Sequence, residues 1–219
     1  LKDYFTGSGV PRFNPFYITK MITNMSAGMI SIKHGFMGAN FATVSACASS
    51  NHAIITAFNF IRTGLADIMV SGGTEAAITP SSVGGFNSMK ALSTNNENYA
   101  TASRPYDVTR DGFVIGEGAG AIVLEEYEHA KKRGAKIYAE LCGGGMSCDA
   151  YHISATHPEG VGAALCMKNA IKDAGLKPED INYVNTHGTS TPVGDMPELF
   201  ALKSTLGDSY SKTYISSTK

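Results

Sequence analysis

The chain has 219 residues, of which 43% are hydrophobic and 17% are charged, with a formal net charge of −1. This apolar content suffices for a sizeable core and excludes a disordered chain, while the balanced charge argues against a nucleic-acid-binding protein, which needs a basic face for phosphates. The apolar runs fall short of the roughly 18 residues of a membrane span, so no membrane segment is expected. Four cysteines are too few for a disulfide scaffold, which favours a reducing, cytoplasmic setting.

Apolar periodicity predicts strands that alternate with helices in the first part of the chain. In chain order, the pattern predicts a loop over residues 1–20, helical spacing over 18–32, a short buried strand over 41–47, an amphipathic helix over 49–62, and a strand over 67–71 that two glycines close. Gly64 follows the second helix as a C-terminal cap. Residues 76–111 contain several turn signals and predict irregular or partly helical structure.

The alternation continues in the second part. The pattern predicts strands over 113–115 and 119–125, a charged helix over 126–133, a strand over 137–142, a helix over 161–174, a strand over 183–185, a helix over 196–206 and a strand over 214–216. The 24 glycines cluster between these elements, where glycine lets one backbone approach another closely. The sequence therefore predicts a layered α/β fold.

Cys47 is a candidate nucleophile because it stands where a predicted buried strand runs into a helix. Small residues flank it, in the string Val44-Ser45-Ala46-Cys47-Ala48-Ser49-Ser50. The free N–H groups and the dipole of a helix start favour a thiolate, which would lower the pKa of this cysteine and let a backbone N–H bind an oxyanion. The alternative is a small buried hydrophobic residue, as most intracellular cysteines are.

His187 is the second candidate, at the end of a predicted strand and directly before Gly188. Hydroxyl side chains surround it in the string Asn185-Thr186-His187-Gly188-Thr189-Ser190-Thr191. Histidine acts as acid, base or hydrogen-bond donor near neutral pH. The alternative is a polar turn whose hydrogen bonds are all satisfied locally.

Three other patterns in the sequence give weaker indications of a functional site. Cys142, Cys148 and His152 have a spacing that fits no usual zinc pattern, so no metal site is predicted. The glycines of residues 116–120 stand between two strands, whereas a dinucleotide fingerprint stands between a strand and a helix. Cys166 lies on the apolar stripe of its helix and is expected in the core.

Many motifs in one order resemble a single family. They are Ser45-Ala46-Cys47-Ala48-Ser49, the segment 67–75, Gly85-Phe86, Lys90-Ala91-Leu92-Ser93, Ser103-Arg104-Pro105-Tyr106-Asp107, Arg110-Asp111-Gly112-Phe113, Glu125-Glu126 with His129-Ala130, His187-Gly188-Thr189-Ser190-Thr191 and Ser216-Ser217-Thr218-Lys219. Together they resemble the elongating β-ketoacyl-acyl-carrier-protein synthases, the second (FabF-like) type most closely. The resemblance implies the thiolase-like fold, in which two similar α/β halves place five-stranded sheets between helices.

The resemblance also implies a domain division. Residues 1–134 would be the latter part of the N-terminal half, with the nucleophile, and residues 135–219 the first part of the C-terminal half, with the catalytic histidine. Family chains are longer, so this chain would be incomplete at both ends. On that interpretation it lacks a second histidine and a glycine-rich loop, and we expect it to be inactive on its own.

Site residues follow from the resemblance position by position. Cys47 would accept the acyl group, His187 would be the first catalytic histidine and Lys219 the active-site lysine. The pantetheine arm would bond to Thr189 and Thr191, and to Ser154, which stands where the family often has threonine. Phe86 would line the acyl tunnel. Asp195 and Glu198 would form an acidic set behind the site that orients the lysine and histidine.

The implied reaction is a decarboxylative condensation. Acyl carrier protein would deliver an acyl group to Cys47, and malonyl-carrier protein would then lose carbon dioxide and extend the chain. No metal or organic cofactor is implied, because the phosphopantetheine belongs to the carrier. The family's enzymes are homodimers, so a homodimer is expected for the whole protein.

Several alternatives stay open from the sequence. Polyketide ketosynthases and coenzyme-A thiolases share the implied fold, and a non-catalytic chain-length-factor-like partner keeps the fold but loses the cysteine. The presence of Cys47 counts against that last class. A cysteine hydrolase with a Cys–His pair is a further interpretation, and it would need an Asn or Asp that orients His187.

Overall fold

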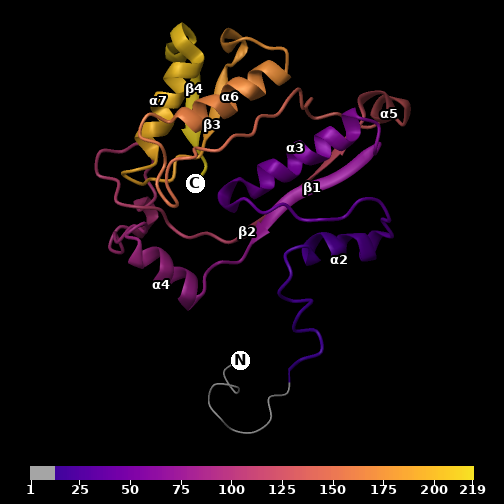
Figure 1. Ribbon diagram of the computed structural model, residues 1–219, viewed down its shortest axis with the longest axis horizontal. Coiled ribbons are helices and arrows are strands. Elements are labelled where there is room, and N and C mark those ends of the chain that lie inside the picture. The colour runs from indigo at the N-terminus through magenta and orange to yellow at the C-terminus, as the bar shows by residue number, and fades with distance from the viewer. Residues whose placement is uncertain (1–12) are drawn as a thin grey trace. The chain divides into compact units, whose positions relative to one another are not determined.

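The structure is a computed structural model that describes residues 13–219. The chain divides into two compact units, residues 1–53 and residues 54–219. Its longer helices are α2 (Met25–His34), α3 (Ser49–Arg62), α4 (Pro80–Ser88), α5 (Tyr127–Lys132), α6 (Val161–Asp173) and α7 (Asp195–Leu206). The strands are β1 (Ile68–Glu75), β2 (Gly118–Glu125), β3 (Tyr183–Thr186) and β4 (Tyr214–Ser217), and Figure 1 shows these elements. Short 3₁₀ helices are η1 (Ala46–Ala48), η2 (Tyr99–Thr101), η3 (Pro178–Asp180) and η4 (Gly207–Lys212).

The first unit is mostly turns and helix. Part of the predicted loop over residues 1–20 lies outside the described residues, and from Phe13 to Asn24 the chain forms no regular element. Helix α2 therefore starts seven residues later than the helical spacing suggested, and it ends at Gly35, which adopts the left-handed conformation with φ of 68°. The side chain of Asn14 accepts a hydrogen bond from the N–H of Phe16, a local turn that competes with helix at this point.

The strand predicted over residues 41–47 is not formed. A strand needs a neighbour for its ladder, and the described residues of this unit contain no other strand. The apolar side chains that suggested a buried strand are also exposed, 45% for Phe41 and 78% for Val44. Helix α3 has the predicted bounds.

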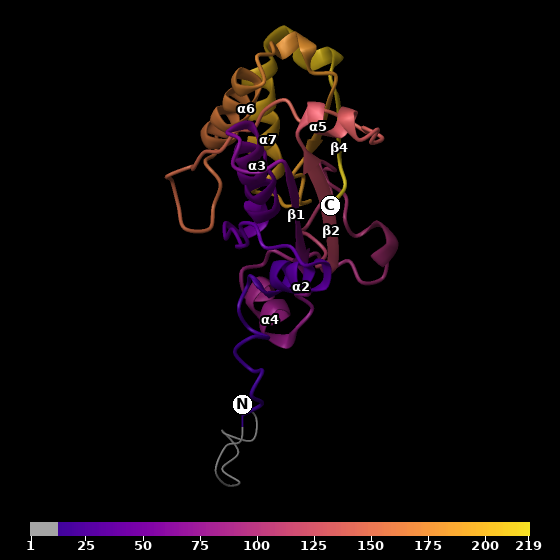
Figure 2. The same ribbon diagram turned by 90° about the vertical axis from the view of Figure 1, so that its right-hand side faces the viewer.

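The second unit contains two small sheets among its described residues. Strands β1 and β2 pair antiparallel, from Ile68 opposite Glu125 to Glu75 opposite Gly118, and they lie side by side in both views (Figures 1 and 2). Gly72 does not close β1, as the sequence suggested, but lies within it. A side chain at this position would collide with the backbone of Gly120 and Ala121, which accounts for the glycine. The resemblance implies five-stranded sheets, whereas each sheet among the described residues has two strands.

The second sheet positions the candidate site. Strands β3 and β4 pair in parallel, with Tyr183 opposite Tyr214 and Thr186 opposite Ser217. Both strands match the prediction within one residue. Helices α6 and α7 pack on each other near this pair (Figure 1). Most of the fully buried side chains belong to α7, including Ala201 and Leu202, so the core of this unit is centred on that helix.

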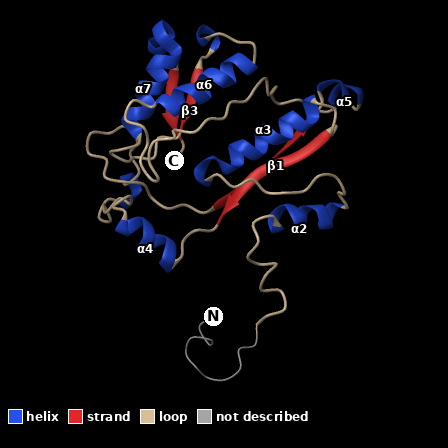
Figure 3. Ribbon diagram, in the orientation of Figure 1, coloured by secondary structure: helices blue, strands red, loops and turns tan. Residues whose placement is uncertain are grey.

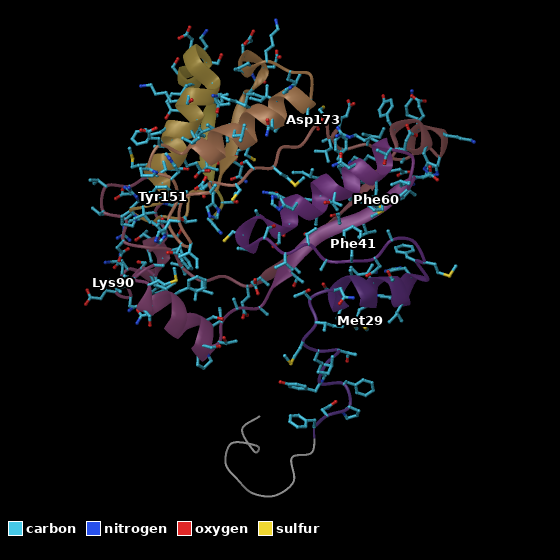
Figure 4. All side chains as sticks on the ribbon, viewed as in Figure 1. Met29, Phe41, Phe60, Lys90, Tyr151 and Asp173 are labelled. Carbon is cyan, nitrogen blue, oxygen red and sulfur yellow. The ribbon has the colours of Figure 1, made fainter. Side chains whose placement is uncertain are left out.

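A glycine run crosses between two helices. A side chain at Gly144 would meet Ile55 of α3, and one at Gly145 would collide with the backbone of α6. At the end of α6, Asp173 (Figure 4) forms an ion pair of 2.8 Å with Arg62 and accepts a hydrogen bond from the N–H of Gly144. Only glycine fits this passage.

Two other predicted strands are not formed. Residues 137–142 run as a loop (Figure 3) without pairing to another strand among the described residues. Residues 113–115 make one isolated bridge, between Phe113 and Leu92. Periodicity identifies an apolar run, but pairing decides whether that run becomes a strand.

Two further observations concern the helices. The irregular stretch 76–111 contains α4, which Thr79 caps by accepting the N–H of Ser82. No helix in the described part of the chain is both long enough and apolar enough to cross a membrane.

The end of β2 and helix α5 are joined by a charge cluster. Glu125 receives two hydrogen bonds from Arg133, at 2.7 and 2.6 Å, and lies 2.6 Å from Nδ1 of His129. His129 pairs with Glu125 although its side chain stays 41% exposed. These partners, Arg133 first, lower the pKa of Glu125 to about 2.

We predict an acid-dependent loss of stability from this cluster. A carboxyl whose pKa falls on folding stabilises the fold above its unfolded pKa, roughly 4.3, and this contribution is lost as the pH falls toward 2. Glu125→Gln should therefore destabilise the protein at pH 6, and the difference from the parent should shrink between pH 5 and pH 2.

Urea unfolding at each pH measures this difference. Glu128→Gln is the matched control, because Glu128 lies three residues later, on α5, and its pair with Lys131 is exposed. A difference between parent and Glu125→Gln that stays constant from pH 6 to pH 2 would contradict the assignment.

Candidate active site

The His187 turn, residues 187–191, directly follows β3. Its backbone takes conformations that side chains disfavour, with φ of 38° at Gly188 and 66° at Ser190. Gly188 is required because a side chain there would meet Ser217 of β4. The turn is therefore shaped by its neighbours and needs specific partners for its N–H groups.

Glu198, in the first turns of α7, supplies two of these partners. One carboxylate oxygen accepts the N–H of His187 at 2.7 Å, and the other accepts the N–H of Gly188 at 2.9 Å. Within the described residues, the hydrogen bonds of His187 all involve its backbone, and the residue is exposed. Glu198 thus fixes where the histidine stands and leaves the imidazole available for chemistry.

Asp195, the first residue of α7, is fully buried. Its carboxylate accepts the N–H of Ser190 at 3.1 Å and the N–H of Tyr106 at 2.8 Å, and lies 3.3 Å from Nε of Arg110. Arg110 also donates to the carbonyl of Thr191 at 3.2 Å. A buried carboxylate needs such a full set of partners, and here the set ties the turn to a distant segment.

That segment, residues 103–112, was missed as part of the site. The N–H of Arg104 donates to the hydroxyl of Ser190 at 3.1 Å, and the N–H of Gly112 donates to the carbonyl of Ser190 at 2.9 Å. The Tyr106 hydroxyl donates to Glu198 at 3.1 Å. The available signal was the series of charged residues Arg104, Asp107, Arg110 and Asp111 within one short loop.

The two predicted pantetheine-binding threonines lie together. The hydroxyls of Thr189 and Thr191 are 2.9 Å apart, and that of Thr191 also accepts the N–H of Gly194 at 3.1 Å. Both side chains are partly exposed. The turn therefore presents a pair of hydroxyls beside His187.

Lys219 reaches the same turn through β4. The hydroxyl of Ser217 donates to the carbonyl of Gly188 at 2.9 Å, and the N–H of Lys219 donates back to that hydroxyl at 3.2 Å. Ser103 donates to the carbonyl of Lys219 at 2.8 Å. The structure thus places the lysine backbone next to the His187 turn. Among the described residues, Asp195 and Glu198 contact backbone N–H groups, the Arg110 side chain and the Tyr106 hydroxyl, and these contacts do not include the Lys219 side chain.

The other two predicted substrate contacts come earlier in the chain than the His187 turn. Phe86, on α4, packs edge-to-face on Phe113 with ring centroids 5.1 Å apart, and Phe113 follows the Gly112 that bonds to the turn. Ser154 is exposed, and its N–H donates to Nδ1 of His152. Two residues on, Thr156 donates to the carbonyl of Val193, so this loop reaches the segment that follows the turn.

Cys47 lies in the first unit, in the 3₁₀ turn that leads into α3. The predicted helix start is confirmed, but it is preceded by a tight turn in which Ala46 has a φ of 50°. Ser49 braces that turn by donating to the carbonyl of Ala46 at 2.7 Å and accepting the N–H of Ser45 at 2.8 Å. Cys47 is exposed, at the N-terminal end of a 14-residue helix.

Cys166 and the possible metal-binding side chains are the other candidates for a second site. Cys166 is partly buried, its thiol donates to the carbonyl of Gly145 at 3.2 Å, and burial raises its pKa. Residues 13–219 hold no cluster of three or more His, Cys, Asp or Glu side chains arranged for a metal ion.

We predict that Asp195→Asn destabilises the protein strongly. Removing one partner of a buried ion pair costs about 3–5 kcal/mol, because the other charge is left uncompensated. Here Arg110 is only 13% exposed and would lose its carboxylate. Urea unfolding measures the loss.

Asp173→Asn is the control for this substitution. Its ion pair with Arg62 is exposed, 45% and 29% for the two side chains. An exposed pair contributes about 1 kcal/mol or less. Equal losses for the two variants would refute the special role of Asp195.

Comparison with known protein families and their members identifies relatives of this chain. Residues 5–130 match the family "Beta-ketoacyl synthase, N-terminal domain", and residues 138–219 match "Beta-ketoacyl synthase, C-terminal domain". The chain is 50% identical over 217 residues to 3-oxoacyl-[acyl-carrier-protein] synthase 2 of Coxiella burnetii, covering 99% of this chain and 52% of that protein. It is 54% identical over 198 residues to the mitochondrial 3-oxoacyl-[acyl-carrier-protein] synthase of Arabidopsis thaliana, covering 90% and 43%.

Solved structures agree. A β-ketoacyl synthase from Burkholderia phymatum matches with a TM-score of 0.91 at 37% identity, covering 100% of this chain and 52% of that one. A type II polyketide-synthase acyl-carrier protein in complex with its ketosynthase matches with a TM-score of 0.91 at 39% identity, covering 94% and 51%. The chain thus spans about half the length of these relatives, and the predicted α/β, thiolase-like fold class is confirmed. The chain belongs to the β-ketoacyl synthase family.

Proposed function

We propose that the protein carrying this chain is a condensing enzyme of fatty-acid synthesis, a 3-oxoacyl-acyl-carrier-protein synthase. The observation that carries the proposal is the His187 turn, where backbone-only anchoring leaves an imidazole available beside two threonine hydroxyls. The relatives at about 50% identity, which bear this enzyme's name, support it.

In the proposed first half-reaction, the thiolate of Cys47 attacks the thioester carbonyl of an acyl-carrier protein. The carbon–sulfur bond to the carrier breaks, the carrier leaves as a thiol, and the acyl group stays on Cys47. Cys47 lies directly before the start of α3, where the dipole of a helix favours negative charge and so a thiolate.

In the second half-reaction, malonyl-carrier protein loses carbon dioxide. The electron pair of the broken carbon–carbon bond forms an enolate, whose oxygen accepts a hydrogen bond from the His187 imidazole. The enolate carbon then attacks the acyl-cysteine carbonyl and releases Cys47 as thiolate. The product is a 3-oxoacyl chain two carbons longer on the carrier.

The remaining residues have supporting parts in this proposal. Thr189 and Thr191 bond to the pantetheine arm of the carrier, and Ser154 adds a weaker contact. Phe86, packed on Phe113, faces the acyl chain. Lys219 supplies positive charge beside the histidine, while Asp195 and Glu198 hold the turn.

Partners and setting are part of the same proposal. Acyl carrier protein is the macromolecular partner, and one solved relative is described with its acyl-carrier protein. The phosphopantetheine of that carrier is the only prosthetic group needed. The division at residue 134, a homodimer and a cytoplasmic location stay predictions, and relatives named mitochondrial and chloroplastic show that location varies in this family.

A polyketide ketosynthase is the second candidate. A type II polyketide complex matches this chain with a TM-score of 0.91, but at 39% identity, below the 50% of the fatty-acid relatives. The reaction products distinguish the two, because fatty-acid synthesis requires extension of saturated acyl chains. Condensation only of poly-keto acyl chains would favour the polyketide interpretation.

We predict that His187→Ala separates the two half-reactions. Loss of one oxyanion donor costs roughly 100- to 1,000-fold in the step that forms the enolate. Acyl transfer to Cys47 should fall far less, since the thiolate needs no base. Release of labelled carbon dioxide from malonyl-carrier protein measures the first step, and acylation by labelled acyl-carrier protein measures the second.

Two controls accompany this experiment. Cys47→Ser should abolish acylation, and His34→Ala, at the exposed end of α2, should leave both rates unchanged. Equal losses of decarboxylation and acylation in His187→Ala would show that the histidine is a general structural element and not the enolate-binding group.

A further inference from the structure

Tyr106 contacts both carboxylates that hold the His187 turn. Its N–H donates to Asp195 at 2.8 Å, and its hydroxyl donates to Glu198 at 3.1 Å. Asp195 in turn accepts the N–H of Ser190, while Glu198 accepts those of His187 and Gly188. One residue from a distant segment therefore supports the turn at both ends.

The backbone conformation of Tyr106 is energetically unfavourable, which indicates that contacts with neighbouring residues hold it in place. Its φ is 66°, a left-handed conformation that bulky residues rarely adopt. Burial, and then the negative charges of Glu198 and Asp195, raise the pKa of its phenol well above the ordinary value. The hydroxyl is thus protonated at any working pH and always available to donate.

The proposed mechanism gives Tyr106 no chemical task, and a ring alone would fill the same space. Without the hydroxyl, the Glu198 oxygen that binds Gly188 would lose its second donor. That carboxylate could then rotate away from the two N–H groups it holds. Because the His187 ring is positioned only through its backbone among the described contacts, such rotation would move the imidazole.

We propose that Tyr106 is a positioning residue for the condensation, which fixes Glu198 through its hydroxyl and Asp195 through its N–H and so sets the orientation of the His187 imidazole. This inference rests on the proposed function for its catalytic consequence. Its structural core, the Tyr106–Glu198–His187 chain of hydrogen bonds, is independent of the substrate.

Tyr106→Phe is the decisive variant, because it removes the hydroxyl and keeps the ring and the N–H to Asp195. The kcat of malonyl decarboxylation should fall about 3- to 10-fold, in the range expected for the net contribution of one typical hydrogen bond. The KM for malonyl-carrier protein and the rate of Cys47 acylation should stay unchanged. Tyr99→Phe, which removes the hydroxyl of an 80% exposed tyrosine, is the matched control and should change nothing.

A double-mutant cycle tests whether the effect passes through Glu198. In a Glu198→Gln background, Tyr106→Phe should cause little further loss of kcat, since the carboxylate it supports is already gone. Full additivity of the two losses would overturn the proposed route.

Amide hydrogen exchange gives a readout that does not depend on activity. In Tyr106→Phe, exchange at His187 and Gly188 should accelerate several-fold, while exchange at Ser190, held by Asp195, should not. Unchanged exchange at both amides would show that the Tyr106 hydroxyl does not stabilise the hydrogen bonds from Glu198 to the turn. Accelerated exchange with an unchanged kcat would overturn the catalytic role of Tyr106. If the whole protein that carries this chain is inactive, the proposed function is refuted, and the exchange result alone decides whether Tyr106 supports the turn.

Discussion

The buried carboxylate of Asp195 is the constraint on which the site depends. A fully buried charge is tolerated only with a complete set of partners, and Asp195 obtains them from Ser190, Tyr106 and Arg110. Those partners come from the turn after β3 and from the segment before β2. Satisfying one charge at the start of α7 therefore assembles parts of the chain that lie far apart in sequence.

Glu198, one helical turn later, accepts the N–H groups of His187 and Gly188, just as Asp195 accepts the N–H of Ser190. Both carboxylates bind backbone N–H groups, which shapes the turn without occupying its side chains. A histidine held in this way keeps its imidazole for a substrate. The arrangement accounts for a turn with two left-handed residues, since the strain is offset by hydrogen bonds to charged acceptors.

Much of this could be predicted from the sequence, and the failures have physical causes. Helix α3 and the strands β3 and β4 follow from local periodicity, and the turn at His187 follows from its glycine and hydroxyl residues. The strands expected over 41–47 and 137–142 are absent, because a strand depends on a partner that local pattern does not reveal. Tyr106 and Arg110 were missed as site residues because their partners lie more than 80 residues away. Asp195 and Glu198 were expected to support the site, but only the structure shows that they accept hydrogen bonds from backbone N–H groups of the turn.

The central claim is that Cys47 accepts the substrate's acyl group and that the His187 turn serves the step that follows. The most direct measurement is mass spectrometry of the protein after incubation with an acyl-carrier protein and proteolytic digestion. The account predicts an added acyl mass on the peptide that contains Cys47, lost on treatment with hydroxylamine, which cleaves thioesters. An acyl mass on a peptide with Cys142, Cys148 or Cys166, or no acyl-protein at all, would contradict it.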